Sequence, residues 1–429
     1  MNIPNVQKNI ILESKKIIKN NYFFSNSLSY FPIFADTPGT LLLKSKNEKK
    51  YKFNFFINYL KFFFSILFSR VEFKKYFKDN KYFKNIYFSW AFKNNFDSSG
   101  NFKDRYLNRN ISNLKNTLLF LIYLDEKLPI KVKSNTVLVY KKSFLKNFNL
   151  YFFFKYLFTS INKNFFKNIS SFNSLSKQLI EFINENIQID KLKKMFIIYE
   201  GQPYQKNLIY FLKQKKKSIK ITGYDHSAPP ALPLNLLFDG CSPDRLLITG
   251  KEQAKFYKKF LSWPKTNLKV IPSFRFKNEK KEFFQNKIFL PFELSDKNSF
   301  LKNFESLVSL NIINNIKSFK IKIHPLGLKL NEHIKFAKNL EKIIEKKSFV
   351  KKNRNENSSI FFGQTTAILV ALELNFKCYH VCSYPIFDSY SSELWSSIKV
   401  KQLTNNLFIY ELRKKNSFIK KGKNNEKIF

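Results

Sequence analysis

The sequence predicts an α/β protein in which two doubly wound, Rossmann-like domains face a cleft, after a helical N-terminal region rich in Phe and Lys. Short apolar runs alternate with longer amphipathic stretches, which is typical of a mainly parallel sheet covered by helices on both faces. The runs form two successive series, and each series is large enough for one such domain. A length of 429 residues fits this organisation.

Residues 1–85 are rich in Lys, Asn and Phe and are mostly helical in pattern. The most apolar stretch is Phe53 to Phe68, but Lys61 interrupts it, so it lacks the roughly 18 uninterrupted apolar residues of a membrane span. Two interpretations stay open: a buried aromatic helix, and an amphipathic helix lying in the membrane interface. The first residues are polar where a signal peptide is apolar, so we expect a cytoplasmic protein, at most peripheral at the inner face of the membrane.

Residues 86–280 carry the first series of runs, which we expect to form the first domain. Its predicted strands are Thr117–Asp125, Thr136–Tyr140, Met195–Tyr199, Ser218–Thr222, Arg245–Thr249 and Leu268–Pro272. The stretch Phe274–Asn286 is charged and lacks apolar periodicity, which indicates a linker between domains.

Residues 287–412 carry the second series and form the second predicted domain. Its predicted strands begin at Lys287 and continue with Phe319–Ile323, Ser359–Phe362 and Cys378–Val381. We expect residues 413–429 to be a basic, weakly ordered tail.

The net charge of +45 suggests a nucleic-acid binder at first sight, but the kind of basic residue argues against it. Seven of the 76 basic residues are arginine, the residue that recognises bases and phosphates best, and the lysines are spread along the chain. We therefore expect no nucleic-acid partner. The charge would still attract anionic lipid head groups, nucleotide phosphates and acidic glycans.

The cysteines predict neither a disulfide framework nor a metal site. Cys241, Cys378 and Cys382 cannot all pair, which favours a reducing compartment. No further Cys or His repeats the Cys378/Cys382 spacing, so we expect no metal there and no cofactor.

Two polar sites directly follow strands of the first domain, where open α/β sheets bind their ligands. Glu200 and Gly201 follow one strand; the carboxylate could act as a general base, or it could mark the start of the next helix. Asp225 and His226 follow the next strand; the histidine, scarce in this chain, could take part in catalysis, or the two residues could form a turn network that holds the loop.

Two more sites follow strands of the second domain. His324, with Pro325 stiffening its turn, could donate to a phosphate or ribose oxygen. Gly363, Thr365 and Thr366 precede a helix and could bind a phosphate through hydroxyl and backbone N–H groups, although the threonines could equally be ordinary N-caps.

Two isolated polar residues complete the candidates. Glu373 follows the threonines by two helical turns, and it could contact a ribose or lie at the surface. Arg105 belongs to a polar patch, Asp104 to Tyr106, that could contact an acceptor or form a turn.

The order of these motifs resembles that of bacterial sialyltransferases, polysialyltransferases and capsule-polysaccharide transferases of GT-B type. Those families share an acidic-Gly motif, a His-Pro motif and a Ser/Thr pair, matched here by Glu200-Gly201, His324-Pro325 and Thr365-Thr366 over about residues 195 to 380. Here the acidic motif holds one acid, after Tyr199, where the families have two. The resemblance implies that Glu200 is the general base and that the other two motifs bind the nucleotide phosphate.

The resemblance implies a metal-independent glycosyltransferase of surface-polysaccharide biosynthesis. It would transfer an acidic sugar from a CMP-activated donor to a hydroxyl of a glycan or lipid-linked acceptor. The alternatives are a CDP-polyol glycerophosphotransferase and a non-catalytic basic protein that binds membranes or RNA. We assign the candidates to catalysis (Glu200, His226), to the nucleotide (His324, Pro325, Gly363, Thr365, Thr366, Glu373) and to the acceptor (Gly201, Asp225, Arg105).

Overall fold

The computed structural model describes residues 2–20, 71–78, 82–140, 174–276, 280–294, 296–313, 315–328, 330–346 and 357–422. The expected interfacial segment Phe53 to Phe68 lies outside these residues. Within the described part of the chain, no helix combines the length and the apolar character that crossing a membrane requires.

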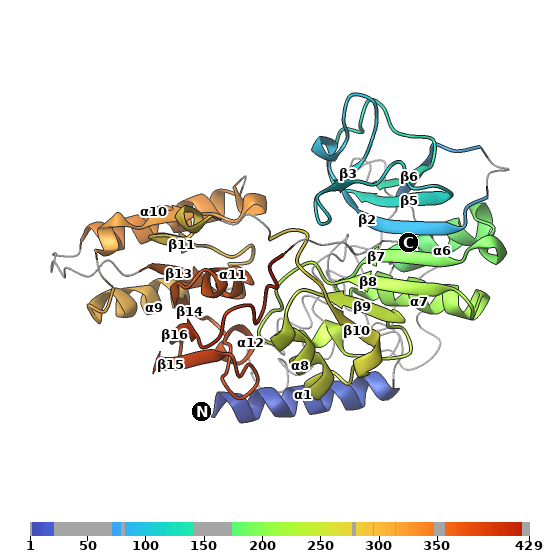
Figure 1. Ribbon diagram of the computed structural model, residues 1–429. Coiled ribbons are helices and arrows are strands. Elements are labelled where there is room, and N and C mark those ends of the chain that lie inside the picture. Colours follow the sequence, from blue (N-terminus) through green and yellow to red (C-terminus); the bar gives the residue numbers. More distant parts are fainter. Residues whose placement is uncertain are drawn as a thin grey trace.

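The first domain is built on an eight-stranded sheet in the order β1-β6-β5-β2-β7-β8-β9-β10 (Figure 1). All neighbours are parallel except β1, which pairs antiparallel with β6 at one edge. The strands are β1 (Glu72–Lys75), β2 (Asn85–Ala91), β5 (Thr117–Tyr123), β6 (Thr136–Tyr140), β7 (Lys194–Ile198), β8 (Lys220–Tyr224), β9 (Arg245–Ile248) and β10 (Leu268–Val270). A small hairpin, β3 (Lys103–Asp104) and β4 (Arg109–Asn110), follows β2.

The central strands are buried on both faces. Every residue of β5, from Thr117 to Tyr123, is buried, as a parallel strand covered by helices requires. The helices of this domain are α6 (Ser174–Asn186), α7 (Pro203–Lys215) and α8 (Lys251–Phe260).

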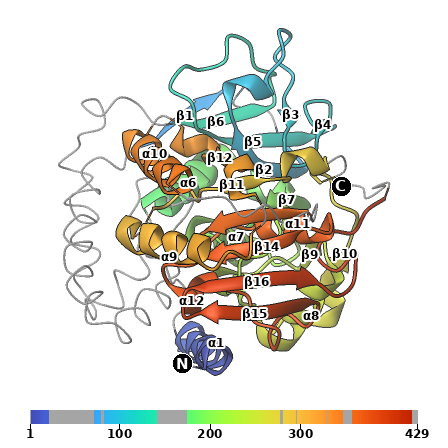
Figure 2. The ribbon, with the colours of Figure 1, turned by 90° about the vertical axis from the view of Figure 1, so that its left-hand side faces the viewer.

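The second domain is built on a six-stranded sheet in the order β12-β11-β13-β14-β16-β15. β12, β11, β13 and β14 are parallel, and an antiparallel pair, β16 and β15, extends one edge (Figure 2). The strands are β11 (Lys287–Phe289), β12 (Lys320–Lys322), β13 (Ser358–Phe362), β14 (Lys377–Val381), β15 (Ile398–Thr404) and β16 (Leu407–Leu412). The helices are α9 (Lys297–Ser309), α10 (Asn331–Glu345), α11 (Ala367–Glu373) and α12 (Pro385–Asp388).

Strand β13 shows why its apolar run is continuous. Ile360 and Phe362 belong to the cluster that contains Phe300 of α9 and Phe336 of α10, whereas Phe361 belongs to the cluster of the other face. Successive side chains of a strand point to opposite faces, so both faces need apolar residues. The predicted α/β class with two mainly parallel sheets is confirmed.

The C-terminal residues correct the prediction of a weakly ordered tail for the part up to residue 422. The chain leaves β16 and returns to the first domain, where Phe418 and Ile419 are buried. The backbone N–H of Lys420 donates to the Thr249 carbonyl at 2.7 Å. Since Phe418 and Ile419 are apolar and the lysines around them are solvated, the segment binds despite its charge.

The N-terminal region, residues 1–85, which we expect to be mostly helical, also contributes a strand. Helix α1 (Ile3–Asn20) lies at the bottom of Figure 1 and packs on α12, where the Gln7 amide donates to the carbonyls of Ile386 and Ser389. Residues Glu72–Lys75, however, form strand β1 of the first sheet. The first sheet therefore begins before the expected boundary at residue 86.

Candidate active site at the strand ends

Glu200 and His226 meet at the carboxyl ends of the neighbouring strands β7 and β8. The Glu200 Oε1 and His226 Nε2 atoms lie 3.5 Å apart. The side chain of Glu200 is 19% exposed, and that of His226 is 4% exposed. A carboxyl group that reaches solvent beside a buried imidazole is an arrangement that can exchange a proton with a bound ligand.

The turn after β7 fixes Glu200 through its backbone. Gly201 has a φ of +68°, and a Cβ atom there would lie 2.1 Å from the carbonyl oxygen of Asn235. The Gln205 side chain accepts from the Glu200 N–H at 2.9 Å, and the Asn235 amide donates to the Glu200 carbonyl. Helix α7 begins at Pro203, as the helix-start interpretation predicts. Gly201, expected at the acceptor, shapes the turn.

Aromatic side chains surround His226. The Tyr106 ring lies 4.1 Å from the imidazole between centroids and the Trp90 ring 6.4 Å, both edge-to-face. The Trp90 indole N–H donates to the Tyr204 hydroxyl at 2.7 Å. Sequence reasoning did not identify Trp90, because it lies in an apolar run that resembles the core. It did not identify Tyr204 either, because nothing at the start of α7 distinguishes this residue from its neighbours.

Burial determines the ionisation of the pair. Burial, and then the charge of Asp225, raise the pKa of Glu200 to about 8, against the lowering effects of Gln202 and Arg275. Burial, and then the charges of Arg275 and Arg105, hold the pKa of His226 well below its usual range. At pH 7 both groups are therefore mainly uncharged. The buried Nδ1 of His226 has no hydrogen-bond partner among the described residues.

Asp225 faces away from this pair, which corrects its expected role at the acceptor. Its carboxylate accepts from Gln253 at 2.6 Å and from the Tyr257 hydroxyl at 2.7 Å, both on α8, and the residue is 1% exposed. Burial raises its pKa to about 7. Asp225 therefore holds the His226 loop against α8, as the network interpretation predicts.

The polar patch around Arg105 forms a turn, as one of its two interpretations predicts. The buried Asp104 accepts from the Ser89 hydroxyl at 2.6 Å and from the backbone N–H groups of Tyr106 and Leu107. This turn puts Tyr106 against His226. Arg105 is exposed, with its guanidinium 5.1 Å from the centre of the Phe92 ring.

His324 follows β12 in the second domain and is partly enclosed. Its ring lies 5.7 Å from that of Phe292 between centroids, and Pro325 begins a short 3₁₀ turn. Burial, followed by the charges of His333 and Arg275, lowers the pKa of His324. His333, on α10, is fully buried, and its Nε2 lies 3.0 Å from the Phe292 carbonyl oxygen. His333 therefore fixes the loop that carries Phe292.

The loop after β13 is fixed in the same way by another histidine. Gly363 has a φ of +56°, and its carbonyl lies 2.7 Å from Nε2 of the buried His380. The Thr365 hydroxyl accepts from the Ala367 N–H at 3.3 Å, whereas Thr366 makes no side-chain cap. Both threonines are half-buried. Strand β11 lies between β13, which this loop follows, and β12, which His324 follows.

Glu373 does not belong to this loop, which corrects its assignment to the nucleotide. Its Oε2 accepts from the Asn416 N–H at 2.7 Å and its Oε1 from the Phe418 N–H at 2.6 Å. The residue is 5% exposed. Glu373 therefore anchors the returning C-terminal segment, whose backbone N–H groups occupy both carboxylate oxygens.

Arg275, which sequence reasoning missed, connects the sites of the two domains. It follows β10 in the linker, is exposed, and its guanidinium lies 5.2 Å from the centre of the Phe276 ring. Its positive charge lowers the pKa of Glu200 and His226 in the first domain and that of His324 in the second, in each case after the effect of burial. The charge of Arg275 therefore acts on both strand-end sets.

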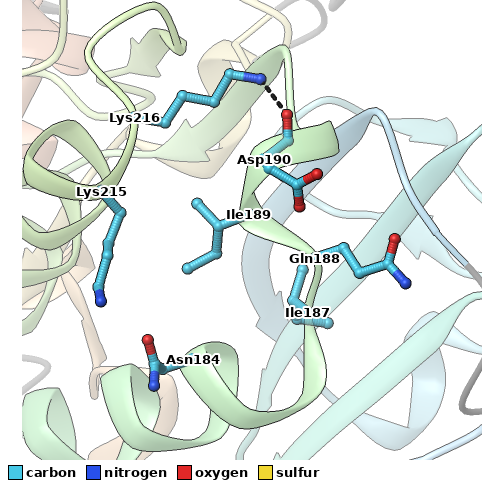
Figure 3. A pocket seen from close by; sticks show the side chains of 7 residues that line it. All are labelled: Asn184, Ile187, Gln188, Ile189, Asp190, Lys215 and Lys216. Carbon is cyan, nitrogen blue, oxygen red and sulfur yellow. Dashed lines mark hydrogen bonds between the residues drawn. The ribbon is translucent and has the colours of Figure 1, made fainter.

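Two further features do not contribute chemistry to this site. In the described part of the chain, no three His, Cys, Asp or Glu side chains gather as metal ligands would. The open pocket in Figure 3, lined by residues such as Asn184, Ile189 and Lys215, lies at the amino ends of β7 and β8. Glu200 and His226 lie at the other ends of these two strands.

Comparisons with known proteins give only distant likenesses. No family model matches the sequence, and no curated protein matches it. Among solved structures, an alpha,alpha-trehalose 6-phosphate synthase from Burkholderia multivorans has 8% identity and a TM-score of 0.35, over 66% of this chain and 76% of that one. A UDP-GlcNAc 2-epimerase from Neisseria meningitidis bound to UDP-GlcNAc has 8% identity and a TM-score of 0.37, over 73% and 85%. A glycosyltransferase from Rickettsia africae ESF-5 has 9% identity and a TM-score of 0.27, over 66% and 73%. With every TM-score below 0.5, these likenesses carry no argument about activity.

Proposed function

We propose that this protein is a glycosyltransferase that moves a sugar from a nucleotide-activated donor to a hydroxyl group of a glycan. The observation that carries the proposal is the Glu200–His226 pair, 3.5 Å apart at the carboxyl ends of β7 and β8. Partly exposed Glu200, with a pKa near 8, has the proton affinity that a general base needs close to neutral pH.

In this reaction the acceptor hydroxyl oxygen attacks the anomeric carbon of the donor sugar. The new carbon–oxygen bond forms as the bond between the sugar and the nucleotide phosphate breaks. The hydroxyl proton passes to the ionised carboxylate of Glu200, and the bonding electrons leave with the phosphate. His226, neutral and next to Glu200, can accept a hydrogen bond from the newly protonated carboxyl group.

The donor nucleotide would bind in the second domain, at the ends of β12 and β13. His324 and the Gly363–Thr366 loop supply an imidazole, two hydroxyls and backbone N–H groups, all suited to phosphate oxygens. The charge of Arg275 acts on both Glu200 and His324, which fits a donor whose sugar reaches from the second domain toward the base. The motif resemblance favours a CMP-linked acidic sugar and a surface polysaccharide or its lipid-linked precursor as acceptor.

Calorimetric titration with CMP, CDP and UDP tests the donor site. We expect saturable CMP binding that His324→Ala weakens about tenfold, the usual effect of losing one hydrogen bond to a charged group. The matched control is Glu341→Gln, on the exposed side of α10. Preference for CDP would instead support the polyol-phosphate transferase. Binding of no nucleotide beyond a salt-sensitive background would refute the proposal.

A further inference from the structure

The imidazole of His226 has few hydrogen bonds of its own. Its Nδ1 is buried and has no hydrogen-bond partner among the described residues, and its Nε2 lies 3.5 Å from Glu200, which is longer than a usual hydrogen bond. The position of the ring therefore depends on the Tyr106 and Trp90 rings beside it and on the backbone of its own loop.

Two side chains of the second domain hold this loop by its carbonyl groups. The hydroxyl of Tyr390, which follows α12, donates to the Pro229 carbonyl at 2.9 Å. The indole N–H of Trp395, which precedes β15, donates to the Ala231 carbonyl at 2.9 Å. Both side chains are buried. Because a buried carbonyl without a donor is unfavourable, the two bonds fix the segment that directly follows His226.

The first domain holds the other end of the loop, and Trp395 contacts that support as well. Asp225 accepts hydrogen bonds from two side chains of α8. The Trp395 ring stacks on Phe256 of the same helix, with the ring centroids 4.1 Å apart. Trp395 therefore packs on the helix that holds one end of the loop and donates to the other end.

Tyr390 is also connected to the Gly363 loop, through a chain of buried hydrogen bonds. Its backbone N–H donates to the Tyr410 hydroxyl at 3.2 Å, and this hydroxyl lies 3.1 Å from Nδ1 of His380. The Nε2 of His380 lies 2.7 Å from the Gly363 carbonyl oxygen. Since a carbonyl only accepts, Nε2 carries the proton and Nδ1 accepts from Tyr410.

The ionisation of His380 agrees with these directions. Burial lowers its pKa to about 4, against the raising effect of the bond to Gly363, so at pH 7 the neutral ring has one donor and one acceptor. The Cys382 thiol lies 3.4 Å from the same Nδ1, but a thiol is a weaker donor than a phenol. Each donor between the Gly363 and Pro229 carbonyls therefore meets an acceptor.

We propose that Tyr390 and Trp395 are positioning residues that hold His226 from the second domain. In the proposed reaction the His226 loop flanks the general base and the Gly363 loop serves the donor phosphate, so the reacting atoms meet only if both loops are held in place. The inference rests on the proposed function for these two roles, and it deepens that function by naming the residues that set them relative to each other.

NMR of the histidine rings tests the proposal, because the chain has four histidines. In ¹H–¹³C spectra of protein labelled at these rings, His226→Gln and His324→Gln assign two of the signals. Tyr390→Phe removes only the hydroxyl that reaches Pro229. We expect it to shift the His226 signal and to leave the His324 signal in place.

A second variant and a matched control accompany this measurement. Trp395→Phe removes the indole N–H and keeps an aromatic ring against Phe256, and it should also shift the His226 signal. The control is Tyr379→Phe, since the Tyr379 hydroxyl likewise donates to a buried backbone carbonyl, that of Ile312 at 3.1 Å, but on the other face of the second sheet. It should leave the His226 signal unchanged. Circular dichroism melting confirms that each variant is folded.

Two results would overturn the inference: a His226 signal that neither Tyr390→Phe nor Trp395→Phe shifts, or one that Tyr379→Phe shifts as much. Titration of the unmodified protein with CMP separates this outcome from the proposed function. CMP that leaves the His324 signal unchanged would refute the donor site, while shifts of the His226 signal in the two variants would still support the positioning. CMP that shifts the His324 signal, with no effect of the variants on His226, would refute the positioning alone.

Discussion

Replacing Glu200 by glutamine should remove a pH-dependent cost to stability. Burial raises the pKa of Glu200 from 4.5 to about 8, so the folded protein holds this proton more tightly than the unfolded chain does. The stabilising contribution of the protonated group is complete below pH 4.5 and is lost as the pH rises to about 8. At about 1.4 kcal/mol per pKa unit, the full change is at most about 5 kcal/mol. Glutamine cannot ionise and lacks this contribution.

Urea unfolding at pH 5 and pH 8, followed by tryptophan fluorescence, measures the effect. We expect the free energy of unfolding of Glu200→Gln, relative to the unmodified protein, to rise by about 2 to 3.5 kcal/mol between these pH values, because part of the full change lies below pH 5 and above pH 8. Glu341→Gln, on the exposed side of α10, serves as the control and should show no such rise. A difference that is the same at both pH values within about 0.5 kcal/mol would refute the assignment of a raised pKa to Glu200.

Three further predictions follow from the same geometry. Gly201→Ala would force a Cβ against the Asn235 carbonyl at a positive φ, so we expect a loss of about 2 to 4 kcal/mol in stability and of activity, checked by urea unfolding. Trp395→Ala removes a ring stacked on Phe256 at 4.1 Å across the domain junction, so thermal unfolding should show a loss of about 3 to 5 kcal/mol. For the proposed transferase, kcat/KM should rise with pH up to about 8 as Glu200 ionises, and a flat profile would exclude this residue as the base.

The apolar runs predicted most of the two sheets, because parallel strands buried on both faces need continuous apolar sequence. β6 was placed at its observed bounds, and β7 and β8 lie within two residues of their predicted positions. β2 was missed although it lies at the centre of the first sheet: its run, Asn85–Ala91, lies at the boundary expected at residue 86 between the helical N-terminal region and the first domain.

The Glu200–His226 pair was accessible to sequence reasoning, since both residues follow strands that prove to be neighbours. Arg275 was not, because it lies in a charged linker whose sequence resembles many other Lys-rich segments. Glu373 and Asp225 were misplaced for another reason. Asp225 follows a strand, and Glu373 lies near a strand-end loop. Their hydrogen-bond donors, however, come from distant parts of the chain: the α8 side chain of Gln253 for Asp225 and the backbone N–H of Phe418 for Glu373.

The return of residues 414–422 to the first domain determines whether the two domains can be expressed separately. The chain passes from the first domain to the second through the linker after β10, and it returns after β16. The hydroxyls of Ser396 and Ser397, in the second domain, also donate hydrogen bonds to Glu252 of α8 in the first domain. Neither domain is therefore a module that can be expressed by cutting at the linker alone. A first-domain fragment would need residues 414–422 supplied as a separate peptide to cover Thr249 and Gly250, and a terminal deletion that removes Phe418 would damage the domain most distant from it in sequence.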